Sequence, residues 1–290
     1  MTVYEQPEDA VSVSTDFGVV DLAPASQGTG TWVLMFDYFP QSYVNLADPR
    51  QLRFKYVQWL AALADCVTAP DAPIRALHLG GGGLTLPRYV AATRPGSVQL
   101  VVDRDAALME AVTKVLPPPP DAAMEIRIAD ARDALWALPP RGYDLVVTDV
   151  LIRTGVPARL TSLECATAVA GVLDQGGQYA LNIVDSAPFA FARRQVATFR
   201  AAFGEVGLFG EPEVLRGEGI GNLLLVGANG ALPVRALAER APAPVRLLSG
   251  DALDRFAGDA RPVTDADAVD SPPAAPRQAT GAPPRTGQSC

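Results

Sequence analysis

The stretch Arg75-Ala76-Leu77-His78-Leu79-Gly80-Gly81-Gly82-Gly83 decides the fold class of this chain. Its apolar first half has the length of a buried strand, four glycines follow, and a helical pattern then continues to about residue 94. Glycine lets the backbone turn sharply and lets a ligand lie against bare peptide. A tight strand-to-helix turn that binds nothing would use the same residues, so this run alone leaves both interpretations open.

An acidic residue follows each of the next three predicted strands, and these residues are Asp103, Asp130 and Asp149. The carboxyl ends of parallel strands meet at one edge of a sheet, where open α/β folds bind their ligands. In dinucleotide folds an acid about 20 residues after the glycines bonds the ribose hydroxyls. Three carboxylates suit a nucleoside that carries a sulfonium better than a phosphate-rich cofactor. Helix capping or turn formation explains any one of these residues, and explains the whole set less well.

Two phosphate-binding motifs are missing from the sequence. G-x-G-x-x-G counted from Gly80 requires glycine at position 85, where the chain has Thr85, and G-x-x-x-x-G-K-[ST] does not occur. G-x-S-x-G is also absent, so His78, the only histidine, is expected to be a packed residue of its strand rather than part of a hydrolase set. One histidine and scattered cysteines give no support for a metal site.

Apolar strands alternate with helical segments from residue 75 onward. This pattern predicts a mostly parallel sheet with helices on both faces, the class I methyltransferase (Rossmann-like) α/β fold. Seven strands are expected, at residues 75–79, 97–102, 124–128, 143–148, 177–184, 206–209 and 223–226.

Composition divides the chain into three predicted parts. Residues 1–47 are expected to form a small antiparallel β unit, because short β-rich runs alternate there with turn residues. Residues 48–258 are expected to form the Rossmann-like, nucleoside-binding transferase domain, with a first helix that opens at Asp48-Pro49. Residues 259–290 are rich in Pro and Ala and poor in large apolar residues, so we expect a mostly disordered tail.

The overall composition limits the partners. The 290 residues carry a net charge of −8, which repels phosphate backbones, so nucleic acid is not an expected partner. Cys66, Cys165 and Cys290 form no C-x-x-C pair, which fits a reducing compartment. Neither a signal peptide nor an apolar run long enough for a membrane helix is found. We expect a cytoplasmic protein that has no membrane partner and acts on a small-molecule acceptor.

Several stretches resemble the spermidine synthase (polyamine aminopropyltransferase) family, and in particular its actinobacterial spermidine-synthase-like branch. They are Phe39-Pro40-Gln41-Ser42-Tyr43-Val44-Asn45-Leu46, Phe54-Lys55-Tyr56, residues 79–83, 101–105, 129–131, 144–149 and 221–226, with a weaker echo at 262–270. The resemblance covers roughly residues 30 to 228, and the small β unit matches that architecture. It implies S-adenosyl-methionine or decarboxylated S-adenosyl-methionine as co-substrate, and it is compatible with a homodimer.

The resemblance assigns nucleoside-binding roles to five residues. Gly80, Gly81 and Gly82 would approach the nucleoside and its sulfur. Asp103 lies where the family holds the ribose hydroxyls, and Asp130 lies where an acid contacts the adenine amino group.

Four further residues are implied near the reacting groups. Asp149 takes the place of the first acid in the family's Asp-Ser-x-Asp-Pro loop. Tyr56 and Gln41 match positions that face the substrate cleft, Tyr56 as a catalytic and Gln41 as a cofactor-binding candidate. Asp185 follows the fifth strand, where the family often has an acid, and is a third catalytic candidate. Asp185-Ser186 would equally serve to cap the next helix.

Two positions depart from the family pattern. Gly83 stands where a Gly-Gly-Gly-Asp-Gly turn provides an acid near the aminopropyl amine, and Ile152 stands where the loop after the fourth strand carries its second Asp. A protonated amine needs a carboxylate to dock and a base to remove its proton, and isoleucine does neither.

Two functions follow from these features. The first is a spermidine-synthase-like transferase that moves an aminopropyl or methyl group to an unidentified acceptor, a polyamine included. The second is a non-catalytic nucleoside-binding or scaffold protein that has lost the acids at positions 83 and 152.

Overall fold

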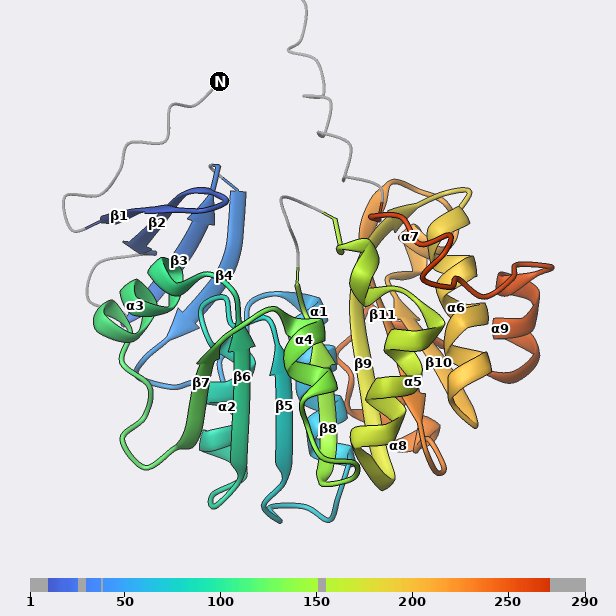
Figure 1. Ribbon diagram of the computed structural model, residues 1–290, viewed down its shortest axis with the longest axis horizontal. Helices are drawn as coiled ribbons and strands as arrows, with labels where there is room; N and C mark the ends of the chain where they lie inside the picture. The colour runs from blue at the N-terminus through green and yellow to red at the C-terminus, as the bar shows by residue number, and fades with distance from the viewer. Residues whose placement is uncertain (1–9, 26–29, 38, 151–154, 272–290) are drawn as a thin grey trace, which may run out of the picture.

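The computed structural model describes residues 10–25, 30–37, 39–150 and 155–271 (Figure 1). In this part of the chain two sheets are formed, a four-stranded antiparallel sheet and an eight-stranded mixed sheet with helices on both faces. The predicted fold class, a Rossmann-like α/β fold preceded by a small β unit, is therefore confirmed.

The small sheet has the strand order β1-β2-β3-β4. Its strands are β1 (Val11–Thr15), β2 (Gly18–Pro24), β3 (Thr31–Phe36) and β4 (Phe39–Asn45). Its side chains Val20, Leu34 and Val44 are buried in one cluster with Leu84 and Met109 of the larger domain. This packing sets β4 beside the glycine-rich turn.

The large sheet has the order β12-β10-β11-β9-β8-β5-β6-β7. The strands are β5 (Arg75–Leu79), β6 (Val98–Asp103), β7 (Ala123–Ile128), β8 (Tyr143–Thr148), β9 (Leu173–Ser186), β10 (Glu205–Gly210), β11 (Ile220–Ala228) and β12 (Arg246–Leu248). From β7 to β9 neighbouring strands are parallel, while β11, β10 and β12 pair antiparallel. The sheet has one strand more than predicted, because β12 is too short to show a period in the sequence.

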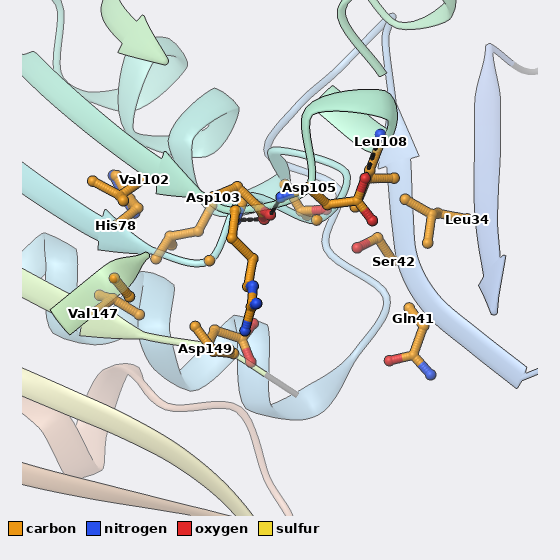
Figure 2. A pocket seen from close by; sticks show the side chains of 18 of the residues that line it. Leu34, Gln41, Ser42, His78, Val102, Asp103, Asp105, Leu108, Val147 and Asp149 are labelled. Carbon is orange, nitrogen blue, oxygen red and sulfur yellow. Dashed lines mark hydrogen bonds between the residues drawn. The ribbon is translucent and has the colours of Figure 1, made fainter. Parts of the chain in front are cut away.

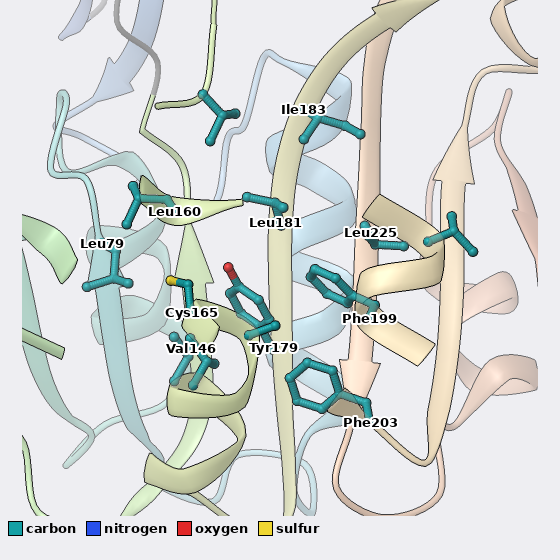
Figure 3. Close-up of a cluster of buried hydrophobic side chains, with 14 of the residues drawn as sticks. Leu79, Val146, Leu160, Cys165, Tyr179, Leu181, Ile183, Phe199, Phe203 and Leu225 are labelled. Carbon is teal, nitrogen blue, oxygen red and sulfur yellow. The ribbon is translucent and has the colours of Figure 1, made fainter. Parts of the chain in front are cut away.

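Helices cover both faces of the large sheet. They are α1 (Lys55–Cys66), α2 (Thr85–Thr93), α3 (Ala106–Val115), α4 (Ala131–Trp136), α5 (Leu163–Val172), α6 (Ala190–Ala202), α7 (Pro212–Leu215), α8 (Val234–Arg240) and α9 (Gly250–Ala257). One core cluster joins one face to α1, α2 and α8, and the other joins the opposite face to α4, α5, α6 and α9. Figure 3 shows the second cluster, in which Tyr179 stacks on Phe199 with ring centroids 5.0 Å apart. Each described helix falls short of the length and apolar content needed to span a membrane.

The first helix begins later than the sequence indicated. It was expected to open at Asp48-Pro49, and it begins at Lys55. Asn45 Oδ1 accepts the amides of Ala47 and Asp48, and Asp48 Oδ1 accepts the amide of Arg50. Side chains that bond nearby backbone compete with helix formation, and they hold this segment as a turn instead.

The folded part of the chain extends beyond the predicted boundary at residue 259. Val263 accepts the amide of Leu163 through its carbonyl, Ser271 donates its amide to the carbonyl of Val156, and both Val263 and Ser271 are buried. Asp265 pairs with Arg132 at 2.5 Å. Residues 259–271, which were assigned to the tail, thus belong to the described fold, where long-range polar contacts that composition does not reveal hold Val263, Asp265 and Ser271. The rest of the predicted tail, 272–290, lies outside the described residues.

Candidate active site

A cavity of about 290 Å³ lies at the carboxyl ends of β5, β6, β7 and β8, between the large sheet, the small sheet and α1. Eight of the nine residues proposed from the sequence line it: Gln41, Tyr56, Gly80, Gly81, Gly82, Asp103, Asp130 and Asp149. In Figure 2 the carboxyl groups of Asp103 and Asp149 lie between His78 and Val147 on one side and Gln41 and Ser42 on the other.

The glycine-rich turn is packed so closely that side chains are excluded. Gly80 has a φ of +101°, and a Cβ there would lie 2.4 Å from the carbonyl oxygen of Asp149. At Gly81 a Cβ would lie 2.7 Å from the sulfur of Met109 and 3.2 Å from Oδ2 of Asp103. At Gly80 the nearest atoms are backbone and the φ is positive, so the turn after β5 can pass this close to Asp149 only as glycine, whereas at Gly81 the Met109 side chain would have to move.

Asp103 is fixed by backbone amides of the glycine-rich turn and of the segment that follows it. Its Oδ2 accepts the amide of Gly81 at 2.7 Å, and its Oδ1 accepts the amide of Asp105 at 2.9 Å. Burial raises the pKa of the Asp103 carboxyl, and these amide bonds oppose that rise. Each oxygen keeps a lone pair for a further donor, so the carboxylate is preoriented toward the cavity.

Asp130 both caps a helix and lines the cavity. Its Oδ1 accepts the amides of Arg132 at 3.0 Å and Asp133 at 3.2 Å, which makes it the N-cap of α4. Its Oδ2 lies 3.5 Å from Nη1 of Arg159. Capping and ligand binding were alternatives in the sequence, and the geometry is compatible with both at once because one oxygen serves the cap while the other faces Arg159.

Asp149 is the centre of a hydrogen-bond network. Its Oδ2 accepts the hydroxyl of Tyr56 at 3.2 Å, and its Oδ1 accepts Nδ2 of Asn182 at 2.8 Å. Asn222 Nδ2 donates in turn to Oδ1 of Asn182 at 3.1 Å. The network therefore joins α1, β8, β9 and β11 at one point of the sheet edge.

Burial controls the protonation of this network. It raises the pKa of Asp149, and the hydrogen bonds from Asn182 and Tyr56 oppose the rise. The pKa of Tyr56 is raised well above its ordinary value by burial and by the charge of Asp149. Tyr56 is thus a permanent donor, and Asp149 is an acceptor whose basicity exceeds that of an exposed carboxylate.

Asp185 is the one proposed residue that the fold does not bring to the cavity. Its Oδ1 accepts the amide of Ser186 at 2.7 Å and its Oδ2 accepts the amide of Ala192 at 2.9 Å, in the first turn of α6. The carboxylate is buried and serves these backbone donors. The fold therefore gives it the local capping geometry that the sequence analysis weighed as its alternative.

Gly83, one of the two departures from the family pattern, packs against the small sheet. At Gly83 a Cβ would lie 2.9 Å from Cβ of Ser42 and 2.9 Å from Cγ2 of Val44, and the Gly83 amide donates to Ser42 Oγ at 3.1 Å. The small sheet therefore closes the position where the family has its acid. Ile152 lies outside the described residues.

Several residues of the site were missed from the sequence. Asn182 and Asn222 sit in apolar strands, where an amide side chain is a signal of a polar network; Asn182 is buried and Asn222 is partly buried. Arg159 lies in the short 3-10 turn Ala158–Leu160, and no sequence motif marked it as a site residue. Ser42 lies within the stretch on which the resemblance rests, yet its bond to Gly83 depends on the docking of the two sheets. Among the described residues no three His, Cys, Asp or Glu side chains are arranged to hold a metal ion.

Comparison with known proteins agrees with this architecture. No protein-family model and no curated protein matches the sequence. Among solved structures, a probable spermidine synthase from Corynebacterium glutamicum matches with a TM-score of 0.81 and 25% identity, over 88% of this chain and 96% of that one.

Two more distant structures share the fold. A spermidine synthase in complex with the transition-state analogue AdoDATO matches with a TM-score of 0.58 and 18% identity, over 78% of this chain and 75% of that one. Human methyltransferase-like protein 13 in complex with SAH matches with a TM-score of 0.50 and 22% identity, over 69% of this chain and 89% of that one. By its structure, this chain is thus a match to the spermidine synthases, an actinobacterial protein of that description among them.

Proposed function

We propose that this chain is a transferase that binds S-adenosyl-methionine or its decarboxylated form and moves a methyl or aminopropyl group to a small-molecule acceptor. The observation that carries the proposal is the pairing of Gly81 with Asp103 at 2.7 Å beside the network of Asp149. It sets bare backbone, a preoriented carboxylate and a basic carboxylate along one edge of the sheet.

The cavity suits an adenosine bearing a positive sulfur. Asp103 and Asp130, at the ends of β6 and β7, offer acceptors for ribose hydroxyls and for an exocyclic amine. The glycine turn leaves backbone exposed between them and Asp149. Two related folds are described in complex with AdoDATO and with SAH, which supports the same class of ligand here.

The chemistry would be a displacement at carbon. The acceptor's lone pair attacks the carbon bonded to the sulfonium sulfur, the carbon–sulfur bond breaks, and its electron pair leaves on a neutral thioether. An amine acceptor that docks as an ammonium would first give one proton to the ionised Asp149, to which Tyr56 also donates, and this frees the lone pair; after the attack the nitrogen carries the transferred group and remains protonated. Positioning supplies most of the rate in such a reaction, since the leaving group is already charged.

The proposal is tested by binding and turnover together. Thermal shift with S-adenosyl-methionine, decarboxylated S-adenosyl-methionine and methylthioadenosine measures binding, and mass spectrometry of reactions with amine acceptors, putrescine included, measures transfer. We expect stabilisation by at least one sulfonium nucleoside and a thioether product that is lost in Asp149→Asn. Because general bases contribute about 100- to 10,000-fold, a variant within threefold of wild type would remove Asp149 from the mechanism.

A non-catalytic nucleoside binder is the second candidate. The close contact of Gly83 with Ser42 and Val44 favours it, since an acid cannot stand there without moving the small sheet. In that case the nucleosides stabilise the protein, while no thioether product forms with any acceptor.

A further inference from the structure

The cavity has a second wall on the side of β8 and α1, away from the acids at the ends of β6 and β7. His78 of β5 and Val147 of β8 are register partners in neighbouring parallel strands, so their side chains stand on the same face of the sheet. Asp149 is two residues beyond Val147 and belongs to the same face. This wall therefore runs from Asp149 down to His78.

Apolar side chains cover this wall. Leu60 of α1, Leu86 of α2 and Val147 are buried in one cluster, and Tyr56 packs against it. The cavity residues of α1, α2 and β8 on this side include Phe54, which precedes α1, and Val57, Leu60, Leu86, Pro87 and Val147. Thr85 also lines the cavity, and its hydroxyl donates to the carbonyl of Tyr43 at 3.2 Å. A ligand that reaches this side meets hydrocarbon along most of its length.

His78 adds no charge to this wall. Its Nε2 lies 2.9 Å from Oε1 of Gln99, and Nε2 of Gln99 donates to the carbonyl of Pro87 at 2.9 Å. Because the Pro87 oxygen only accepts, the orientation of the Gln99 amide is fixed and its Oε1 must receive a proton from His78. Burial lowers the pKa of His78 to about 4, so the ring is neutral at pH 7.

Asp149 is the only acid on this side among the described cavity residues, since Asp103, Asp105 and Asp130 follow β6 and β7. The first acid in the sequence after Asp149 is Glu164, which accepts the amide of Asp265 at 3.0 Å and does not line the cavity. Position 83 is closed to any side chain by the small sheet. One ammonium can thus be neutralised here, whereas a second would be buried without a partner at a cost of several kcal/mol.

We propose that the space between β8 and α1 is the acceptor subsite, and that its substrate is a primary monoamine with an apolar body rather than a diamine or polyamine. This inference rests on the proposed function. The amine docks at Asp149, and its alkyl or aryl body lies against Val57, Leu60, Leu86 and Val147. Asp149 keeps lone pairs for that ammonium beside the bonds from Tyr56 and Asn182.

The test uses two probes of equal length, n-hexylamine and 1,6-diaminohexane. Each is titrated by calorimetry into the full chain saturated with methylthioadenosine. We expect hexylamine to bind at least tenfold more tightly than the diamine. Equal or tighter binding of the diamine, or no binding of hexylamine, overturns the inference. Failure of methylthioadenosine to bind in the first step contradicts the proposed function instead, so the two failures are distinguished.

A variant locates the subsite. Val57→Phe fills the space beside α1, and we expect it to weaken hexylamine at least tenfold while the affinity for methylthioadenosine stays within twofold. Val234→Phe is the matched control, because Val234 packs on the same core cluster and does not line the cavity. A loss of hexylamine binding in both variants, or in neither, places the subsite elsewhere. Thermal midpoints of both variants check that they fold.

Discussion

The hydroxyl of Tyr56 donates to Oδ2 of Asp149 over 3.2 Å and ties α1 to the end of β8. Tyr56 lies in α1, after the small sheet, and Asp149 follows β8, a central strand of the large sheet. The bond therefore connects two parts of the fold that are far apart in the sequence. Asn182 holds the other oxygen of Asp149 at 2.8 Å. The carboxylate is therefore oriented from two sides before any ligand arrives, which is the arrangement a proton acceptor requires.

Removing the Tyr56 hydroxyl is expected to change the pH dependence of transfer. Transfer to an amine needs Asp149 ionised, and the bond from Tyr56 lowers the pKa of that carboxyl against the effect of burial. In Tyr56→Phe the pKa rises, so the acid limb of the pH–rate profile moves to higher pH and the rate at pH 7 falls. Rates measured from pH 5 to 9 check this.

Tyr89→Phe is the control for that experiment. Tyr89 donates to Oδ2 of Asp65 at 2.9 Å and does not line the cavity. Its loss removes a similar tyrosine–carboxylate bond, and the profile should stay where it is. An acid limb that is unmoved in Tyr56→Phe would show that Asp149 is not the group that titrates.

The glycine turn is expected to tolerate no side chain. Gly80→Ala forces a Cβ into the carbonyl oxygen of Asp149 at a φ of +101°. We expect the free energy of unfolding to fall by about 1–3 kcal/mol, with loss of nucleoside binding, as urea titration and thermal shift measure.

Gly171→Ala is the matched substitution. Gly171 is exposed in α5 and has no atom within 4 Å of a built Cβ. Alanine there should leave stability unchanged or raise it by up to about 1 kcal/mol. Equal losses in the two variants would mean that the contact with Asp149 is not what makes glycine necessary.

His78 gives the chain a predictable dependence of stability on pH. The folded-state pKa is lowered from 6.5 to about 4, so between these values the unfolded state binds the proton and the folded state does not. Stability from this residue is complete above pH 6.5 and declines as pH falls toward 4. Each pH unit in that window costs about 1.4 kcal/mol, and the total is at most about 3–4 kcal/mol.

Urea unfolding of wild type and His78→Gln at pH 7.5 and 5 measures this effect. His78 is the only histidine, and the carboxylates are common to both proteins, so the difference between them isolates it. We expect wild type to lose more stability than the variant on acidification. Parallel losses would show that the imidazole is protonated inside the fold.

Sequence reasoning predicted what depends on local pattern. The strand before Gly80, the glycine run and the strand-end acids all follow from apolar period and turn chemistry, and the edge where Asp103 and Asp149 meet follows from parallel pairing. Gln41, Tyr56, Asp103, Asp130 and Asp149, which are far apart in the chain, line one cavity together with the glycine turn.

What the sequence did not reveal depends on docking between distant elements. The contact of Gly83 with Ser42 requires the packing of the small sheet on the large one. The capping role of Asp185 depends on how the chain enters α6. The partners of Asp265 and Ser271 are side chains and backbone more than 100 residues away, and composition alone placed them in a tail.

The central claim is that the adenosine part of a sulfonium nucleoside is held between Asp103 and the glycine turn. Calorimetric titration of methylthioadenosine into wild type, Asp103→Asn and Asp144→Asn tests it most directly. Asp144 accepts the amide of Arg75 at 2.8 Å and does not line the cavity, so its variant loses a comparable backbone bond elsewhere. We predict one saturable site in wild type and in Asp144→Asn, and about 10- to 100-fold weaker binding in Asp103→Asn. Equal affinity in all three proteins, or no binding to wild type, would contradict the account.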